Sequence, residues 1–381
     1  MPDQGENTGN EGDVVKHASL QKVVSILSGN NSPTFWYVET HSAYPYYNDL
    51  NLSVKAQWRN GIGDLNVKQS AAPPLLQGYL DAAYHDKQKL HDRFPDKQTY
   101  LGSTAQIFHL LKKAGKRVLM TLFEIESEPV EALLTYFEKQ KAAVVLVRPG
   151  DDRIGKSLRA IWDAAIPSTN DDFVMVVQGD CFKLAPLLWE KGTDKQIPDL
   201  VFVDPFNLEK VPGLIESLSN NKLPFACWTP LNCVKEGDGQ KWPATKWSIE
   251  TIESRREWIG NKTAQNFVAK CRDKGCTLAW FCWDEFQGFS RNMHGCQLTF
   301  GNVFSPEFTP AAVWPFNDHT MQLPYLDIDG KIANLDHNFQ NLTTTWQEFG
   351  QELDRSANQV GIENKPGAQW WDKYNAAFWW R

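Results

Sequence analysis

The chain lacks any apolar run near the roughly 18 residues that a membrane-spanning helix needs. Its net charge is −7, so no overall positive field draws it onto a nucleic acid. The first residues are polar and acidic and contain no secretory signal. We therefore expect a cytoplasmic protein with no membrane partner, whose seven cysteines are reduced thiols.

Cysteine spacing typical of metal sites is also missing. Cys271, Cys276 and Cys282 lack the close pairing of zinc ligands. We therefore predict no metal site, and buried free thiols instead.

Because the net charge is negative, an RNA partner would have to bind a local basic patch. The candidates are the stretch 87–97 and the cluster formed by Lys112, Lys113, Lys116 and Arg117. Solvated helix faces are the competing interpretation of both groups.

Apolar runs alternate along the chain with helix-like patterns. Runs typical of buried strands occur at 35–38, 118–122, 143–147, 173–177, 200–203 and 225–228. Helical patterns occur at 13–27, 74–94, 103–114, 129–140, 157–165 and 208–219. This alternation predicts an α/β fold with a doubly wound, mostly parallel sheet and helices on both faces. Further strands are expected near 277–282 and 296–300.

The same pass along the chain predicts three regions. We expect a disordered N-terminus at 1–12 and an α/β domain at 13–302 with a helical insertion at 48–98. An aromatic-rich C-terminal extension follows at 303–381 and includes several of the 16 tryptophans. Its aromatic residues suit docking onto the core, because they bury large areas. Stacking on nucleic-acid bases is the alternative.

Acidic residues follow several predicted strands. Glu39, Glu124 and Asp180 stand in this order, and Asp204-Pro205 follows the strand at 200–203. In doubly wound folds such carboxylates commonly bind a nucleoside cofactor, although an acid after a strand is also often a helix cap. Asp151 is an alternative third acid.

Several blocks together resemble a known family. The blocks are 9–17, which fits Gly-Asn-x-x-Asp-Val-x-Lys-His, then 37–41, 100–103, 204–205, 228–230, and the pair Met293 and Asn302. In this order they resemble the bacterial methyltransferases that modify N6 of an adenine in large-subunit ribosomal RNA.

The resemblance implies a class I methyltransferase fold that binds S-adenosylmethionine. It also implies that the catalytic segment is Asp204, Pro205 and Phe206. The implied cofactor-binding residues are Lys16, His17, Glu39, His41, Gly102, Ser103, Glu124 and Asp180.

The chain departs from this family in two places. The family's loop Ala-Gly-x-Gly-x-Tyr is replaced by residues 42–47, Ser-Ala-Tyr-Pro-Tyr-Tyr, which adds bulk and fixed backbone. Asn207 stands where the catalytic motif has a stacking aromatic residue. Three hypotheses therefore stay open: an amino-group methyltransferase, a catalytically degenerate binding or scaffold protein, and an enzyme of different chemistry on a small molecule.

Simpler interpretations accompany some candidate residues. Lys16 and His17 would be surface residues on the first helix. His41 would be a core residue whose ring is hydrogen-bonded within the protein, and Ser103 would cap a helix. Asp284-Glu285 suits an exposed turn, although paired carboxylates can also perform acid–base chemistry.

Overall fold

The computed structural model describes the following residues: 9, 11–47, 62–63, 74–84, 100–148, 150, 158–167, 169–189, 197–205, 210–230, 277–287, 290–301, 324–326, 332–334 and 377–380. The chain forms two compact units. The first comprises Met1–Asp204, Asn220–Phe225 and Val303–Pro315, and the second comprises Pro205–Ser219, Ala226–Asn302 and Phe316–Arg381.

The first unit contains five parallel strands. They are β1 (Thr34–Glu39), β4 (Arg117–Glu124), β5 (Ala143–Val147), β6 (Phe173–Gln178) and β7 (Leu200–Val203). They lie in the order β7-β1-β4-β6-β5, and every adjacent pair is parallel. All five predicted strands are confirmed within two residues at each end.

These segments form strands because apolar side chains cover both of their faces. The burial of β1, β4 and β6 is nearly continuous, as expected for parallel strands between two layers of helices. On one face of β1, Trp36 stacks on Trp162 with ring centroids 4.3 Å apart, and its indole N–H donates to Thr121 Oγ1. Tyr37 and Glu39 share the other face of the strand because side chains alternate.

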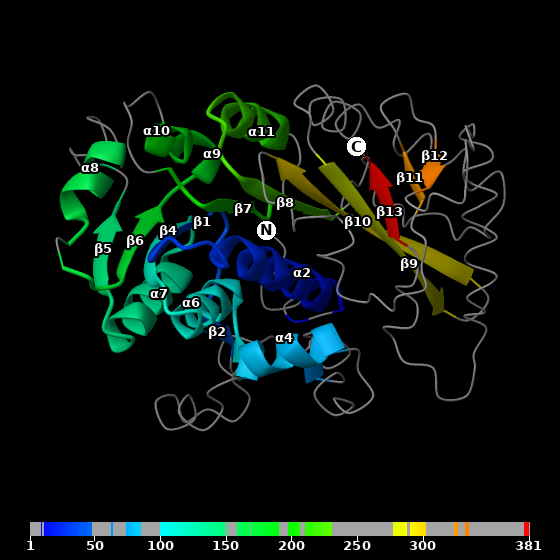
Figure 1. Cartoon of the computed structure of the whole chain (residues 1–381), viewed down its shortest axis with the longest axis horizontal. Helices are drawn as coiled ribbons and strands as arrows, with labels where there is room; N and C mark the ends of the chain where they lie inside the picture. The colour runs from blue at the N-terminus through cyan, green and yellow to red at the C-terminus, as the bar shows by residue number, and fades with distance from the viewer. Residues whose placement is uncertain are drawn as a thin grey trace. The chain divides into compact units, whose positions relative to one another are not determined.

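Helices cover both faces of this sheet, as Figure 1 shows. Helices α6 (Ser103–Lys113) and α7 (Ser127–Lys139) lie on one side, and α8 (Leu158–Ala165), α9 (Cys181–Leu184) and α10 (Pro186–Trp189) lie on the other. The chain runs outward from β1 past β4 to β5 and then returns through β6 to β7. Right-handed crossovers place the outward and return helices on opposite faces.

Two further helices pack beside α6. Helix α2 (Glu11–Ser28) contacts both α6 and α4 (Pro74–Tyr84), which belongs to the predicted insertion. Helix α2 begins two residues before the expected domain start at 13, so the disordered segment predicted for 1–12 is too long at its end. The remainder of the 74–94 pattern lies outside the described residues.

The topology of the first unit specifies where a ligand would bind. Strand β1 is central, with β4 on one side and β7 on the other. The chain order therefore reverses between β1 and β7. In open α/β sheets, ligands bind outside the carboxyl ends of the strands at this switch point.

The second unit holds most of α11 (Val211–Asn220) and β8 (Phe225–Pro230), together with β9 (Thr277–Gln287), β10 (Ser290–Gly301), β11 (Pro324–Leu326), β12 (Ile332–Asn334) and β13 (Ala377–Trp380). Strands β9 and β10 form an antiparallel pair, and β13 pairs antiparallel with β9. The expected boundary at 303 therefore separates strands that belong to one sheet. Asp284-Glu285 lies within β9 and not in a turn.

No helix in the described part of the chain is long and apolar enough to cross a membrane.

Candidate active site

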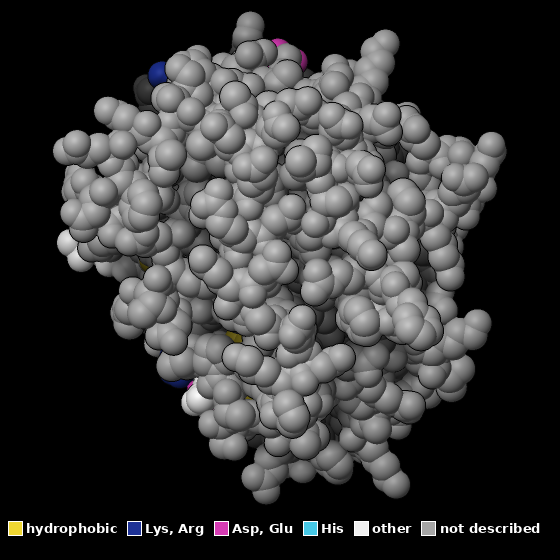
Figure 2. Space-filling view, turned by 90° about the vertical axis from the view of Figure 1, so that its right-hand side faces the viewer, with side chains coloured by type: hydrophobic (Ala, Val, Ile, Leu, Met, Phe, Trp, Pro, Cys, Tyr) yellow, Lys and Arg dark blue, Asp and Glu magenta, His cyan; other side chains and the backbone are white. Residues whose placement is uncertain are grey.

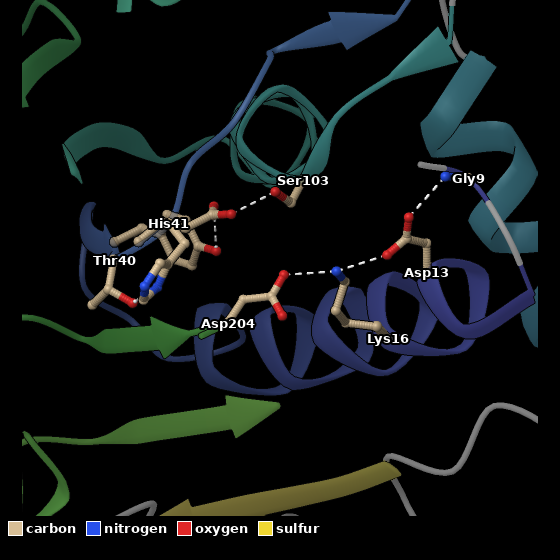
Figure 3. Close-up of polar contacts among 9 residues, drawn as sticks. Gly9, Asp13, Lys16, Thr40, His41, Ser103 and Asp204 are labelled. Atoms are coloured by element: carbon tan, nitrogen blue, oxygen red, sulfur yellow. Dashed lines mark hydrogen bonds and ion pairs between the residues drawn. The ribbon is translucent and has the colours of Figure 1, made fainter. Parts of the chain in front are cut away.

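Lys16 and Asp204 meet at the switch point. Lys16 lies near the start of α2, and Asp204 directly follows β7. Their Nζ and Oδ2 atoms are 2.6 Å apart, and Lys16 Nζ also lies 2.8 Å from Asp13 Oδ1 (Figure 3). The backbone N–H of Gly9 donates to Asp13 Oδ2 at 2.7 Å. A chain of polar contacts therefore joins the N-terminal segment to the end of β7.

Burial makes this ion pair electrostatically strong. Lys16 is only 9% exposed. Burial by itself lowers the pKa of Lys16, but the carboxylates of Asp13 and Asp204 raise it above its ordinary value. Burial raises the pKa of Asp204, and Lys16 opposes that shift. Lys16 is therefore a permanent cation that favours the ionised form of Asp204.

Glu39 provides a second buried carboxyl group, on the strand next to β7. Ser103 Oγ donates to its Oε1 at 2.5 Å, and the Tyr37 hydroxyl donates to its Oε2 at 2.8 Å. Glu39 is 1% exposed. Burial raises its pKa to about 8, with a further contribution from the charge of Asp204, although both hydroxyl hydrogen bonds oppose the shift. Glu39 is therefore largely neutral at pH 7.

Ser103 does not cap its helix. The N-cap of α6 is Gly102, and Ser103 is the first helical residue. The expected cap is wrong because the hydroxyl of Ser103 bonds to the carboxyl group of Glu39. A cap must precede the first helical residue and accept a backbone N–H, whereas Ser103 lies inside the helix and donates to Glu39.

Gly102 is required by a close approach of two backbone segments. Its N–H donates to the Pro45 carbonyl at 2.9 Å, and a Cβ atom placed on it would lie 2.1 Å from the Tyr44 carbonyl oxygen. Its φ of −71° is accessible to any residue, so the requirement is steric and not conformational. Gly102 thus packs against the loop at 42–47.

Replacing Gly102 by alanine is expected to lower the free energy of unfolding by about 2–3 kcal/mol, because backbone must move to relieve the overlap. Urea unfolding followed by circular dichroism measures the change. The matched control is Gly78→Ala in α4, where a Cβ would meet nothing within 4 Å. That control should be neutral or stabilising by up to about 1 kcal/mol. Equal stability of the two variants would contradict the packing argument.

Glu124, at the end of β4, forms a hydrogen bond with the loop at 42–47. Its Oε2 accepts the N–H of Ala43 at 2.8 Å, and its Oε1 accepts the N–H groups of Ile125 and Glu126 at 2.8 and 2.9 Å. Burial raises the pKa of Glu124, and these three donors oppose the shift. Ala43 has φ of 49°, a left-handed conformation that is normally suited to glycine. The loop therefore keeps a glycine-like backbone at Ala43 without glycine.

His41 and Asp180 lie at neighbouring positions of the same sheet edge. Gly179 N–H donates to the Glu124 carbonyl at 2.9 Å, which places Asp180 beside the end of β4. Asp180 caps α9 by accepting the Phe182 N–H at 3.1 Å. His41 Nε2 lies 3.4 Å from Cys181 Sγ.

Lys16 and His17 are not surface residues. His17 is 8% exposed, and its Nδ1 has no hydrogen-bond partner among the residues that the structure describes. Burial lowers its pKa to about 3, so the imidazole is neutral. Its ring lies against Tyr79 of α4, with centroids 6.5 Å apart. A buried nitrogen without a partner is available to a ligand.

Some predicted residues are not tested by this geometry. Phe206 and Asp151 lie outside the described residues, whereas Pro205 is described and buried.

Sequence reasoning missed the roles of Tyr37, Thr40 and Cys181. The contact of Tyr37 with Glu39 could have been predicted, because the two residues lie two positions apart on the same face of a strand. Cys181 directly follows Asp180, but only the fold brings it to His41.

The basic cluster at the end of α6 is largely paired within the chain. Lys112 contacts Asp172, Lys116 donates to the carbonyls of Asn30 and Ser32, and Arg117 donates to the carbonyls of Asp171 and Pro167. The other candidate, 87–97, lies outside the described residues. Figure 2 shows one face of the molecule, on which only a few side chains belong to the described residues.

Comparison with known proteins identifies a fold but no family. No family model and no curated protein matches the chain. The chain is similar to the crystal structure of protein LPL1258 from Legionella pneumophila str. Philadelphia 1, family-model DUF519, with a TM-score of 0.51 and 17% identity over 81% of this chain and 91% of that chain. The METTL16 MTase domain matches at a TM-score of 0.30 and 10% identity, over 76% of this chain and 68% of that chain, too weakly to support an argument.

The strand order and the likeness to LPL1258 together define the class of fold. It is a doubly wound α/β fold with a mostly parallel sheet in the first unit, as the sequence pattern predicted.

Proposed function

We propose that this chain is an S-adenosylmethionine-dependent methyltransferase that acts on an amino group. N6 of adenine in RNA or DNA is the proposed target, with large-subunit ribosomal RNA as the first candidate substrate. The observation that carries the proposal is the contact of 2.6 Å between Lys16 and Asp204 at the switch point of the sheet. The sequence blocks shared with the ribosomal RNA methyltransferases supply the substrate class.

Asp204 and Pro205 suit the activation of an amine. An amine conjugated to a purine ring is a poor nucleophile, and acceptors for its hydrogens favour a lone pair aimed at the methyl donor. Lys16 binds Asp204 through Oδ2, whereas Oδ1 has no hydrogen bond within the described residues. Asp204 Oδ1 would accept one amine hydrogen and the Pro205 carbonyl the other. Asp204 would then take the proton that methylation makes acidic.

The residues at the strand ends fit the cofactor in donor and acceptor type. Glu39 and Glu124 are the last residues of β1 and β4, and Asp180 lies two residues after β6; these strands are adjacent in the sheet. The carboxylates of Glu124 and Asp180 would accept ribose hydroxyls or an amino group. Glu39 is neutral and 1% exposed, and both of its oxygens already accept hydrogen bonds within the chain. Glu124 already accepts three N–H groups of roughly four that a carboxylate can take, so it has room for one hydroxyl. When bound, the cofactor supplies an electrophilic methyl group.

Replacing Asp204 by asparagine is expected to reduce methyl transfer by about 100-fold or more, because the amide cannot accept the amine proton. The assay uses tritiated S-adenosylmethionine and unmodified, in vitro transcribed large-subunit ribosomal RNA, with the product identified as N6-methyladenosine by nucleoside mass spectrometry. The matched control is Asp199→Asn. Asp199 precedes β7 at its other end and accepts the Trp36 N–H at 2.7 Å, so its role is structural. Equal loss in both variants would count against a catalytic role of Asp204.

A catalytically degenerate binding protein is the second candidate. The observation that favours it is the loop at 42–47, where Tyr44 and Pro45 replace flexible residues and Glu124 is already engaged by Ala43. Calorimetric titration separates the two candidates. Absence of binding with S-adenosylmethionine and S-adenosylhomocysteine at millimolar concentration would reject the methyltransferase and support the degenerate protein.

A further inference from the structure

We infer that Cys181 and His41 form a reactive thiol–imidazole pair, in which His41 accepts the thiol proton while the sulfur attacks a small electrophilic carbon. This inference does not depend on methyl transfer. It assigns a modification site to two side chains at the carboxyl edge of the first unit's sheet.

The three side chains involved form a continuous chain of polar contacts. Cys181 Sγ lies 3.4 Å from His41 Nε2, and Nδ1 of the same ring lies 2.8 Å from Thr40 Oγ1. Figure 3 shows Thr40 beside the His41 ring. A nucleophile, a base and a group that orients the base are the parts of an activated nucleophile.

The contact with Thr40 is compatible with the tautomer of His41 that can accept the thiol proton. When the Nδ1–H donates to the Thr40 hydroxyl oxygen, Nε2 carries a lone pair directed at the sulfur. The edge of the ring also packs against Phe182, with centroids 5.5 Å apart, which restricts its rotation. The thiol proton therefore has an acceptor in place before any reagent arrives.

The charge state of His41 sets when the proton can move. An imidazole with a pKa of about 4 is too weak a base to deprotonate a thiol beforehand, so the proton passes to His41 only as the sulfur–carbon bond forms. Burial lowers its pKa to about 4, and the positive charge of Lys16 acts in the same direction. The negative charge of Asp180 opposes the shift without cancelling it. The imidazole is thus neutral at pH 6 to 8, and its lone pair is available throughout that range.

Reaction with iodoacetamide illustrates the step. The sulfur forms a bond to the methylene carbon, the carbon–iodine bond breaks, and iodide leaves with the bonding electrons. The thiol proton passes to His41 Nε2 and then to water. Cys181 is 4% exposed, so only small reagents are expected to react.

The test measures alkylation of the intact, full-length protein by iodoacetamide, residue by residue, using peptide mass spectrometry. Cys227 is an internal reference, because it is a free thiol that is 0% exposed. We expect Cys181 to react about tenfold faster than Cys227. Its rate should change less than about threefold from pH 6 to 8, whereas a thiol without a base gains about tenfold per pH unit below its pKa.

Two variants separate the base from simple exposure. His41→Gln keeps the size and polarity of the side chain but removes the base, so the Cys181 rate should fall about tenfold and regain the ordinary pH dependence. Ser42→Ala alters a neighbour outside the pair and should leave the rate unchanged. Equal rates for Cys181 and Cys227 in the wild-type protein would overturn the inference. So would a His41→Gln rate and pH profile like those of the wild type.

Discussion

Replacing Lys16 by methionine is expected to lower the free energy of unfolding by about 3 kcal/mol at pH 7, because it leaves buried carboxylates without their cation. Asp13 and Asp204 both contact Lys16 Nζ, at 2.8 and 2.6 Å. The matched control is Lys22→Met on the same helix. Lys22 is half-buried and takes part in no described ion pair. The free energy of unfolding of the Lys22→Met variant should therefore lie within about 0.5 kcal/mol of the wild-type value.

The pH dependence of the Lys16→Met variant gives a second measurement. Without Lys16, burial and the negative charge of Asp13 both raise the pKa of Asp204 unopposed, so it lies further above the unfolded value. The folded variant then holds a proton that the unfolded chain releases, and its stability falls as pH rises. The loss of unfolding free energy in the variant, relative to the wild type, should therefore be smaller at pH 5 than at pH 7. Urea unfolding at pH 5 and pH 7 measures this loss. A loss below 1 kcal/mol at pH 7 would show that the ion pair contributes little to stability.

Replacing Glu39 by glutamine is expected to remove a large part of the pH dependence of stability between pH 5 and 8. In the folded protein the pKa of Glu39 is about 8, above its ordinary value of 4.5. Stability from such a group is fully present below the ordinary pKa and is lost as pH rises through the folded value. The loss reaches at most about 1.4 kcal/mol per pH unit for one group.

The glutamine variant keeps the shape of Glu39 and can still accept from Ser103 or Tyr37, but it carries no titrating proton. We therefore expect the wild type to lose about 2 kcal/mol more than the variant between pH 5.5 and 7.5. The measurement is urea unfolding at four pH values on both proteins. Glu138→Gln is the control, because it removes an exposed carboxyl group on α7. Parallel pH profiles for wild type and Glu39→Gln would show that Glu39 is ionised in the fold.

The strands were the most predictable part of the first unit. Segments such as 173–177 are buried on both faces. Such burial requires a continuous apolar run, which is visible in the sequence. The helix over 129–140 was predictable for a different reason: Pro129 lies in the first turn, where its missing N–H costs nothing. The division into units was less predictable, because β13 joins a sheet with β9, nearly 100 residues earlier.

The candidate site was predictable as a set of residues but not as a set of contacts. Acids at the ends of successive strands must share one edge of a parallel sheet, which is why Glu39, Glu124 and Asp180 were found. Nothing local links Lys16 to Asp204, which are 188 positions apart. Ser103 shows the same limit: the sequence predicted a helix cap, but the helix begins at Ser103 itself and its hydroxyl donates to Glu39, 64 positions away.

By itself, the sequence determined the alternation of strands and helices and the chemical types at the strand ends, because periodicity and composition are local properties of the chain. Only the tertiary structure decided which of those groups are charged and which are paired. Glu39 is neutral and Asp204 is held by a cation because burial and distance set those states, and both arise when segments far apart in the sequence pack together. The same packing placed Cys181 against His41, a contact that no spacing in the sequence predicts.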